Sequence, residues 1–220
     1  SGCSSAASIS LGSSVTSVGS HAFYGCSGAS SASLNDGLLT IGDYAFAKSG
    51  LLSIAIPSSA TSIGANSFQS CTSLSSVSFG SSPSLGSIGA YAFDGCALVS
   101  SCGSSESGHV SVPSSVTSIG DYAFQGMTLV TDLVVPDSVT SIGRGAFKGC
   151  ESLTNVTIPF VGNTATSTAA FGVFGYIFGW DTYCYNMYNS GYWNESGFLG
   201  GTYDTGNYSF DYDDSISYGT

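Results

Sequence analysis

The chain has very little positive charge. Its 220 residues contain three Lys and Arg side chains against fourteen Asp and Glu, and only 8% of the residues are charged. The basic residues are Lys48, Arg144 and Lys148, and the formal net charge is −11. Nucleic acids and anionic membrane surfaces are bound through clusters of Lys and Arg. The composition therefore argues against both kinds of partner.

Long apolar runs and motifs for catalysis or metal binding are missing as well. No stretch reaches the ~18 apolar residues of a membrane-spanning helix, so we expect no membrane insertion. The seven cysteines include no Cys-x-x-Cys pair for zinc, and the acidic residues 211–214 lack the glycine and glutamate of an EF-hand loop. The only histidines, His21 and His109, have no Ser or carboxylate motif beside them. We expect no enzyme activity, no metal and no cofactor.

What the chain does contain is one phrase repeated six times between residues 18 and 150. Each copy reads Ile or Val, Gly, two variable residues, Ala or Ser, and Phe. The copies end at Phe23, Phe46, Phe68, Phe93, Phe124 and Phe147, at separations of 23, 22, 25, 31 and 23 residues. A period in the low twenties is typical of a solenoid, in which each unit buries its apolar face only against its neighbours. We expect about six right-handed coils.

Each repeat has two halves. The first half alternates apolar residues toward a proline, as in Ile54-Ala-Ile56-Pro57 and Val156-Thr-Ile158-Pro159, which predicts a short strand in a parallel sheet. The second half carries the glycine, where we expect a backbone conformation that penalises a Cβ, and then the Phe. The small residue before each Phe leaves room for the rings to stack into a continuous core.

The full pattern is Cys-x-x-Leu-x-x-(Val/Ile)-x-Ile-Pro-x-Ser-Val-Thr-Ser-Ile-Gly-x-x-Ala-Phe-x-x-Cys. It resembles the BspA-type leucine-rich repeats of microbial surface proteins over residues 3–159. The resemblance implies a mainly β leucine-rich-repeat solenoid of short strands and turns, used in adhesion and surface recognition, with no active site. It also implies a secreted or cell-surface location. The chain begins inside a repeat without Met, so we expect a processed product or a fragment.

The cysteines allow two interpretations. Most of them share one repeat phase, which favours a ladder of small apolar side chains in the core. Neighbouring coils also place some of them within the Cα distance of a disulfide, although parallel Cβ directions make its geometry awkward. The candidates for such bridges are Cys3 with Cys26, Cys71 with Cys96, and Cys102 with Cys96.

Two repeats are longer than the rest. One gains residues around Gly80-Ser-Ser-Pro83, and the next gains a segment from Ser101-Cys102 to His109. Insertions in a solenoid bulge on its surface, where they serve as recognition loops or are simply tolerated.

Residues 160–220 differ in composition from the repeats of residues 1–159 and form a second segment. They hold nine of thirteen Tyr, both Trp, six acids and no Lys or Arg. We expect this Gly/Tyr-rich segment to cap the solenoid, to bind the next subunit, or to offer a sugar-binding surface. The candidate assembly residues are Tyr176, Phe178, Trp180, Tyr183, Tyr185, Tyr188 and Trp193, and the candidate glycosylation sites are Asn155, Asn194 and Asn207.

Two functions follow from these observations. The first is a non-catalytic extracellular structural protein whose partner is itself, joined head to tail into a surface filament or layer. The second is a cell-surface adhesin or recognition module that binds a host protein, matrix or glycan through the sheet or the loops near Pro83 and Cys102.

Overall fold

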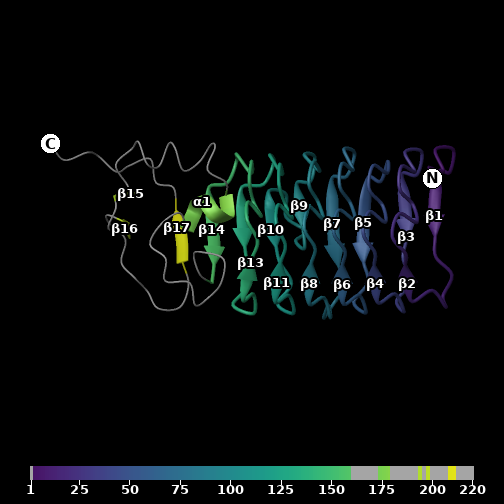
Figure 1. The fold of residues 1–220 in the computed structure, drawn as a ribbon, viewed down its shortest axis with the longest axis horizontal. Coiled ribbons are helices and arrows are strands. Elements are labelled where there is room, and N and C mark those ends of the chain that lie inside the picture. Colours follow the sequence, from purple (N-terminus) through teal and green to yellow (C-terminus); the bar gives the residue numbers. More distant parts are fainter. Residues whose placement is uncertain (1, 160–172, 179–192, 195–196, 199–207, 212–220) are drawn as a thin grey trace.

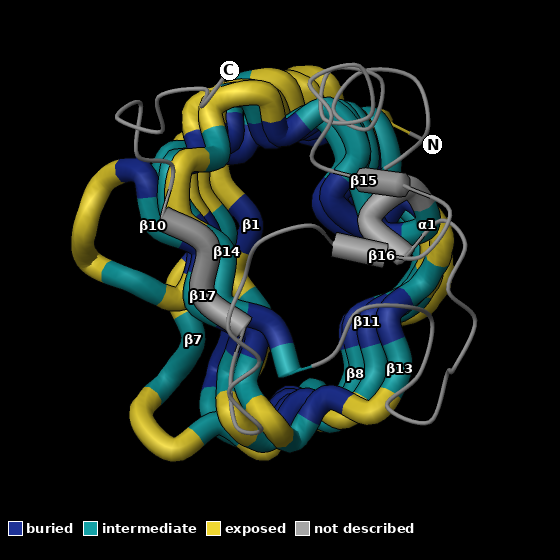
Figure 2. The backbone as a smooth tube through the Cα atoms, turned by 90° about the vertical axis from the view of Figure 1, so that its left-hand side faces the viewer, coloured by how far each residue is buried: buried dark blue, intermediate teal, exposed yellow. Residues whose placement is uncertain are grey.

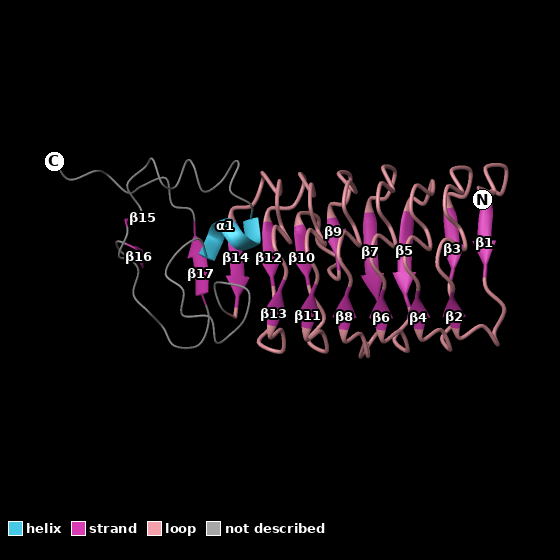
Figure 3. Cartoon of the chain, in the orientation of Figure 1, coloured by secondary structure: helices cyan, strands magenta, loops and turns pink. Residues whose placement is uncertain are grey.

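The chain forms a parallel β-solenoid of about seven turns, stacked along one axis (Figure 1). The computed structural model describes residues 2–159, 173–178, 193–194, 197–198 and 208–211. Two sheets form the walls of the solenoid, and turns and loops occupy the rest of each coil (Figure 3). The mainly β repeat solenoid predicted from the sequence is therefore confirmed.

The larger sheet, sheet A, has the strand order β1-β3-β5-β7-β9-β10-β12-β14-β17, and all of its pairs are parallel except β14 with β17. Its strands are β1 (Ser8–Ser10), β3 (Ser31–Ser33), β5 (Ser53–Ile56), β7 (Ser76–Phe79), β9 (Ser101–Cys102), β10 (His109–Ser111), β12 (Asp132–Val134), β14 (Asn155–Ile158) and β17 (Tyr208–Asp211). Sheet B is made of two-residue strands, namely β2 (Ser17–Val18), β4 (Thr40–Ile41), β6 (Ser62–Ile63), β8 (Ser87–Ile88), β11 (Ser118–Ile119) and β13 (Ser141–Ile142).

The alternation seen in the sequence decides which side chains enter the core. In β5 the burial pattern is exposed, buried, exposed, buried, so that Ile54 and Ile56 point inward between exposed neighbours. The same inward register joins Ile54 to Val77 in the next coil. Each coil therefore adds its inward apolar residues to one continuous core.

The phenylalanines stack as predicted. The rings of Phe23, Phe46, Phe68, Phe93, Phe124 and Phe147 follow one another at centroid distances of 5.2, 5.4, 5.2, 5.6 and 5.3 Å. Four of these rings are fully buried. Offset stacking of this kind adds to the free energy gained by burying the rings themselves.

The repeated glycine has a different role from the one we predict from the sequence. Gly42 and Gly143 do not adopt positive φ. A Cβ on Gly143 would lie 2.2 Å from the backbone nitrogen of Asp121, and one on Gly42 would lie 2.8 Å from the carbonyl oxygen of Val18. The glycine is needed because neighbouring coils approach closely there. In five copies of the repeat the residue two positions after this glycine is left-handed, at φ of 55–58°; these residues are His21, Tyr44, Asn66, Tyr91 and Tyr122.

Five of the six cysteines in the described part of the chain lie in the core, and no disulfide bridge joins the six. All six described cysteines are free thiols, and all but Cys3 are buried. The thiols of Cys71 and Cys96 donate to the carbonyl oxygens of Phe46 and Phe68, both at 3.1 Å. The candidate bridges are therefore not formed among the described cysteines, and the thiols of Cys71, Cys96 and Cys150 point to carbonyls of the preceding coil. Cys102, expected off the ladder, is buried in β9 within sheet A.

The C-terminal end of the solenoid is covered by the chain itself. Helix α1 (Val173–Phe178) takes the place of the next turn, since the amide of Phe147 donates to the carbonyl of Ile177 at 3.0 Å. Ile177 is fully buried, and β17 pairs with β14 at the edge of sheet A. A separate hairpin joins β15 (Trp193–Asn194) to β16 (Gly197–Phe198). The boundary predicted after residue 159 stays a prediction.

Candidate recognition site at the insertions

The outer face of sheet A changes its chemistry at β10. The first outward position of each strand is serine from β1 to β9 and is then ionisable or amide-bearing from β10 to β14. In register this row reads Ser8, Ser31, Ser53, Ser76, Ser101, His109, Asp132 and Asn155. The ordinary repeat thus presents short hydroxyls, while the last three coils present side chains that can bind ions or polar ligands.

The change coincides with the longest spacing between phenylalanines. Between Phe93 and Phe124 the chain adds an extra strand to sheet A: β9 pairs with both β7 and β10. Sheet B gains nothing there, because β8 pairs directly with β11. Part of the insertion, predicted to be a surface loop, is therefore a strand within sheet A, and only residues 103–108 leave the sheet.

Two loops project beyond sheet A where these insertions lie. Figure 2 shows them as exposed segments beside the labels β7 and β10. The loop of residues 80–84 is tied to the preceding coil by the amides of Gly80 and Ser84, which donate to the carbonyls of Ile56 and Ser58 at 2.9 and 2.8 Å. The loop of residues 103–108 returns through Gly108, whose amide donates to the carbonyl of Ser100 at 2.6 Å.

An open groove of about 390 Å³ lies between the two loops. Its walls are mainly apolar and include Phe79, Pro83, Val112, Pro113, Val134 and Pro136. Val134 is 43% exposed although it is a large apolar residue in a strand. This volume is at the small end of the range seen for ligand pockets, so the groove fits one or two side chains of a partner.

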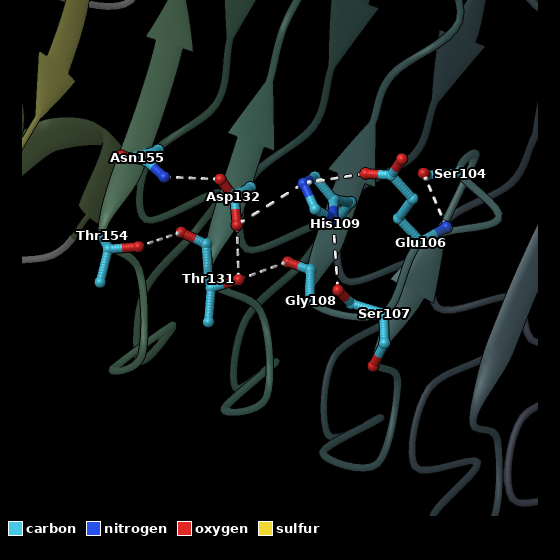
Figure 4. A network of polar contacts seen from close by, with 9 residues as sticks. All are labelled: Ser104, Glu106, Ser107, Gly108, His109, Thr131, Asp132, Thr154 and Asn155. Carbon is cyan, nitrogen blue, oxygen red and sulfur yellow. Dashed lines mark hydrogen bonds and ion pairs between the residues drawn. The ribbon is translucent and has the colours of Figure 1, made fainter.

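A polar network borders this region on the outer face (Figure 4). His109 Nε2 lies 3.5 Å from Glu106 Oε2 and 3.7 Å from Asp132 Oδ2. The Thr131 hydroxyl and the Asn155 amide donate to the two oxygens of Asp132, at 2.5 and 2.6 Å. Side chains on one surface thus join the loop of residues 103–108 to β10, β12 and β14.

The electrostatics of the network favour a charged Asp132. Hydrogen bonds from Thr131 and then Asn155 hold the pKa of the Asp132 carboxyl below its usual value, and the nearby His109 acts in the same direction. Glu106 is 73% exposed at its side chain and Asp132 is 24% exposed. A ligand cation would therefore meet two accessible carboxylates beside an apolar groove.

Sequence reasoning missed these polar residues. Its statement that no carboxylate motif surrounds the histidines is wrong for His109, which contacts Glu106 and Asp132. The spacing of these residues could have revealed the row, since His109, Asp132 and Asn155 follow one another at intervals of 23 residues and so fall on successive coils. Among the described residues, no group of three or more His, Cys, Asp and Glu is arranged to hold a metal ion.

The predicted assembly residues are only partly described. Tyr176 and Phe178 pack against the core of their own chain, and Phe178 lies 6.0 Å from the ring of Phe147. Trp193 begins β15, and Asn194 follows it in the same strand. Trp180, Tyr183, Tyr185, Tyr188 and Asn207 lie outside the described residues.

The remaining glycosylation candidate, Asn155, is exposed in β14, where its amide already donates to Asp132. Its glycosylation stays a prediction, and so does head-to-tail assembly. No helix in the described part of the chain is both long and apolar enough to cross a membrane.

The parallel sheets, the period near 23 residues and the ladders of Phe, Ile and Leu define a leucine-rich-repeat solenoid. The model of the BspA type leucine rich repeat region matches residues 1–107 and 100–174 with six copies. The chain therefore belongs to the BspA-type leucine-rich-repeat family, whose members are generally surface proteins.

Solved structures of bacterial leucine-rich-repeat proteins resemble the chain. The leucine-rich-repeat protein of T. pallidum is 37% identical with a TM-score of 0.60, over 69% of this chain and 66% of that protein. A leucine-rich-repeat protein from Bacteroides ovatus is 22% identical with a TM-score of 0.44, over 72% and 50%. A leucine-rich cell surface protein from Faecalibacterium prausnitzii is 22% identical with a TM-score of 0.36, over 80% and 63%. The chain thus spans less than two thirds of each of these proteins, and no curated protein matches it.

Proposed function

We propose that the chain is a non-catalytic recognition module of a secreted or cell-surface protein, and that it binds its partner at the groove between the two insertion loops. The observation that carries this proposal is the coincidence of three departures from the repeat at one place. The extra strand β9 and the two projecting loops adjoin the groove, and the change from serine to His109 and Asp132 occurs in the two strands, β10 and β12, that line it.

Physical reasons support a binding role for this surface. A solenoid repeat that only has to stack gains nothing from an interruption of its sheet, whereas loops held on a rigid scaffold are the usual carriers of recognition. The groove also combines exposed apolar surface, such as Val134, with polar groups at its border. That combination is typical of sites that bind a ligand in a fixed orientation.

The contacts of the C-terminal segment favour recognition over filament formation. Ile177 is fully buried and the ring of Phe178 packs on that of Phe147, so part of the segment that we expected to join subunits covers its own last coil. The surface at the insertions has no such cover among the described residues. Adhesion to a protein, matrix or glycan partner is accordingly the function we propose.

Binding of the labelled full chain to arrays of peptides and of glycans tests this function. Ser114 is exposed at the rim of the groove, and Ser114→Tyr should fill its entrance without touching the core. Ser13→Tyr is the matched control, because Ser13 is exposed at the same repeat position of the first coil. We expect array ligands that Ser114→Tyr loses and Ser13→Tyr keeps. Ligands bound equally by both variants would contradict a role for the groove.

A further inference from the structure

The groove lies where one strand of sheet A stops early. The ladder between β5 and β7 continues to Ile56 and Phe79, but the ladder between β7 and β9 ends at Val77 and Cys102. On the other side, β10 pairs with β12 as far as Ser111 and Val134. Beyond Cys102, the place of one strand between β7 and β10 is therefore not occupied by sheet A.

The early stop is built into the chain at Gly103. Its amide still donates to the carbonyl of Val77 at 2.9 Å, but its φ is +70°, and the chain then turns outward into the loop. A Cβ at this position would lie 2.0 Å from the carbonyl oxygen of Ser111. Only glycine permits this exit, because both the conformation and the space exclude a side chain.

The interruption leaves backbone groups without their usual partners. In three other coils the residue at the Phe79 position donates to the strand ahead, namely Leu11 to Ser33, Val112 to Val134 and Val135 to Thr157, at 3.0, 3.0 and 2.8 Å, whereas Leu34 in the second coil makes no such bond among the described residues. The corresponding bond from Phe79 is missing among the described residues, since the chain has left the sheet. The carbonyl oxygen of Ser111 lies against Gly103 and accepts no backbone hydrogen bond from residues 103–108.

The gap has the width of one strand. Neighbouring strands lie ~4.8 Å apart, so the edges of β7 and β10 are about two spacings from each other, and one extended chain fits between them. Unpaired strand edges are templates for pairing with another chain. The apolar floor and rim, formed by Phe79, Val112 and Pro113, offer a place for the side chains of that strand.

Charge indicates what kind of strand this is. Glu106 and Asp132 lie beside His109 at the start of β10, on the outer face of the strands that lead to the groove. The Lys and Arg of the chain, at positions 48, 144 and 148, lie in the turns after β4 and β13. The net charge of −11 acts in the same sense. A segment with Lys or Arg beside an apolar residue would pair with the two carboxylates while its backbone follows the edges.

We infer that the groove binds a short extended peptide segment of a partner protein, apolar and basic in alternation, which completes sheet A between β7 and β10. The inference rests on the proposed function and names its ligand as a peptide strand rather than a sugar. Because β7 ends at Phe79 and β10 ends at Ser111, only about two residues of the segment can pair in register beyond Gly103, so the affinity of an isolated peptide is modest and arises mainly from a few backbone bonds and one buried side chain.

The probe is a blocked pentapeptide of Lys, Val, Thr, Val and Lys, titrated into the isotope-labelled full chain and followed by NMR. We expect the amide signals of Phe79, Gly103 and Val112 to shift on binding. The same peptide with N-methylated central amides should bind at least about tenfold more weakly, because it cannot pair with a strand edge. A peptide with Glu in place of both Lys should also lose at least about tenfold in affinity, because its charges repel Glu106 and Asp132.

Matched variants locate the site. Glu106→Lys and Ser114→Tyr should each weaken the lysine peptide severalfold or more, while Asp36→Lys and Ser13→Tyr, exposed in earlier coils, should leave it unchanged. The inference is overturned if the lysine peptide does not bind at millimolar concentration, or if N-methylation leaves its affinity unchanged. Array ligands that are glycans only, and that are lost in Ser114→Tyr, would overturn the peptide inference while leaving the proposed function intact.

Discussion

The ring of Phe178 lies 6.0 Å from the ring of Phe147, at an interplanar angle of 35°. It extends the phenylalanine ladder by one rung beyond the last repeat, although it comes from a helix and not from a repeat. The solenoid is thereby finished by its own chain, because a terminal coil otherwise exposes an apolar cross-section.

The phenylalanine ladder should dominate stability. Phe93 is fully buried between the rings of Phe68 and Phe124. We expect Phe93→Ala to lower the free energy of unfolding by about 3–5 kcal/mol, the usual cost of a buried Phe. Urea unfolding measures this, with Leu98→Ala as the control, since Leu98 is 50% exposed. Equal losses in both variants would show that the ladder is not the core.

The close approach of coils at the repeated glycine can be tested with two glycines of the same phase. A Cβ on Gly143 meets the backbone of Asp121 at 2.2 Å, whereas one on Gly19 meets nothing within 4 Å. Gly143→Ala should therefore destabilise the chain by about 1–3 kcal/mol, and Gly19→Ala should change it by less than about 0.5 kcal/mol. Thermal unfolding of the two variants gives the comparison, and a similar loss in both would point to a conformational role instead.

The hydrogen bonds to Asp132 should make stability depend on pH. Because the folded pKa lies below the ordinary value of 3.8, the contribution is fully present above that value and is lost as the pH falls through the folded pKa. Unfolding measured from about pH 6 downwards should show a shallower acid loss in Asp132→Asn than in the parent chain.

Thr131→Val provides the companion test, because it keeps the carboxylate and removes its strongest hydrogen bond. An NMR titration of the Asp132 carboxyl should then give a higher pKa than in the parent chain. An unchanged value would mean that Thr131 does not stabilise the charged form.

The buried thiols of Cys102 and Cys150 should be inert while the chain is folded. Burial raises the pKa of Cys102 and of Cys150 to about 12, and alkylating reagents react with the thiolate. Iodoacetamide at about pH 8 should modify exposed Cys3 in the native chain and reach Cys102 and Cys150 only after unfolding. Peptide mapping by mass spectrometry distinguishes the sites. A pair of cysteines that resists alkylation after unfolding until a reductant is added would instead indicate a disulfide.

Deleting residues 171–220 separates capping from assembly. Without α1, the amide of Phe147 loses its acceptor on Ile177, so its hydrogen exchange should become faster while that of Phe46 is retained. Sedimentation of the parent chain and of the deletion variant at high concentration measures their oligomeric states independently of hydrogen exchange. Polymers of the parent that vanish on deletion would support the head-to-tail filament, and a parent chain that stays monomeric would exclude it.

The sequence predicts most of the repeat and little of its exceptions. The six phrases ending in Phe specify a stacked ladder because the same residues must meet at every period. They give six turns, whereas the structure has about seven, since Phe178 and Ile177 belong to a helix that lacks the phrase. The role of Gly143 was misread because a sequence does not distinguish a positive φ from a close contact.

The candidate site was predictable only in outline. The two long repeats point to the insertions, but Ser101–Cys102 is too short to show an alternation, so β9 could not be recognised. The groove depends on where β9 stops, which is decided by contacts of Gly103 with another coil. The row of His109, Asp132 and Asn155 follows from their equal spacing once the register is known.

The extra strand also makes the two walls of the solenoid unequal. Between β7 and β10 sheet A advances by two strand spacings, while sheet B advances by one from β8 to β11. The difference of ~4.8 Å has to be taken up within the coils on either side of β9. A ligand lying along sheet A therefore meets serines up to β9 and His109, Asp132 and Asn155 beyond it, with the irregular coil at the boundary.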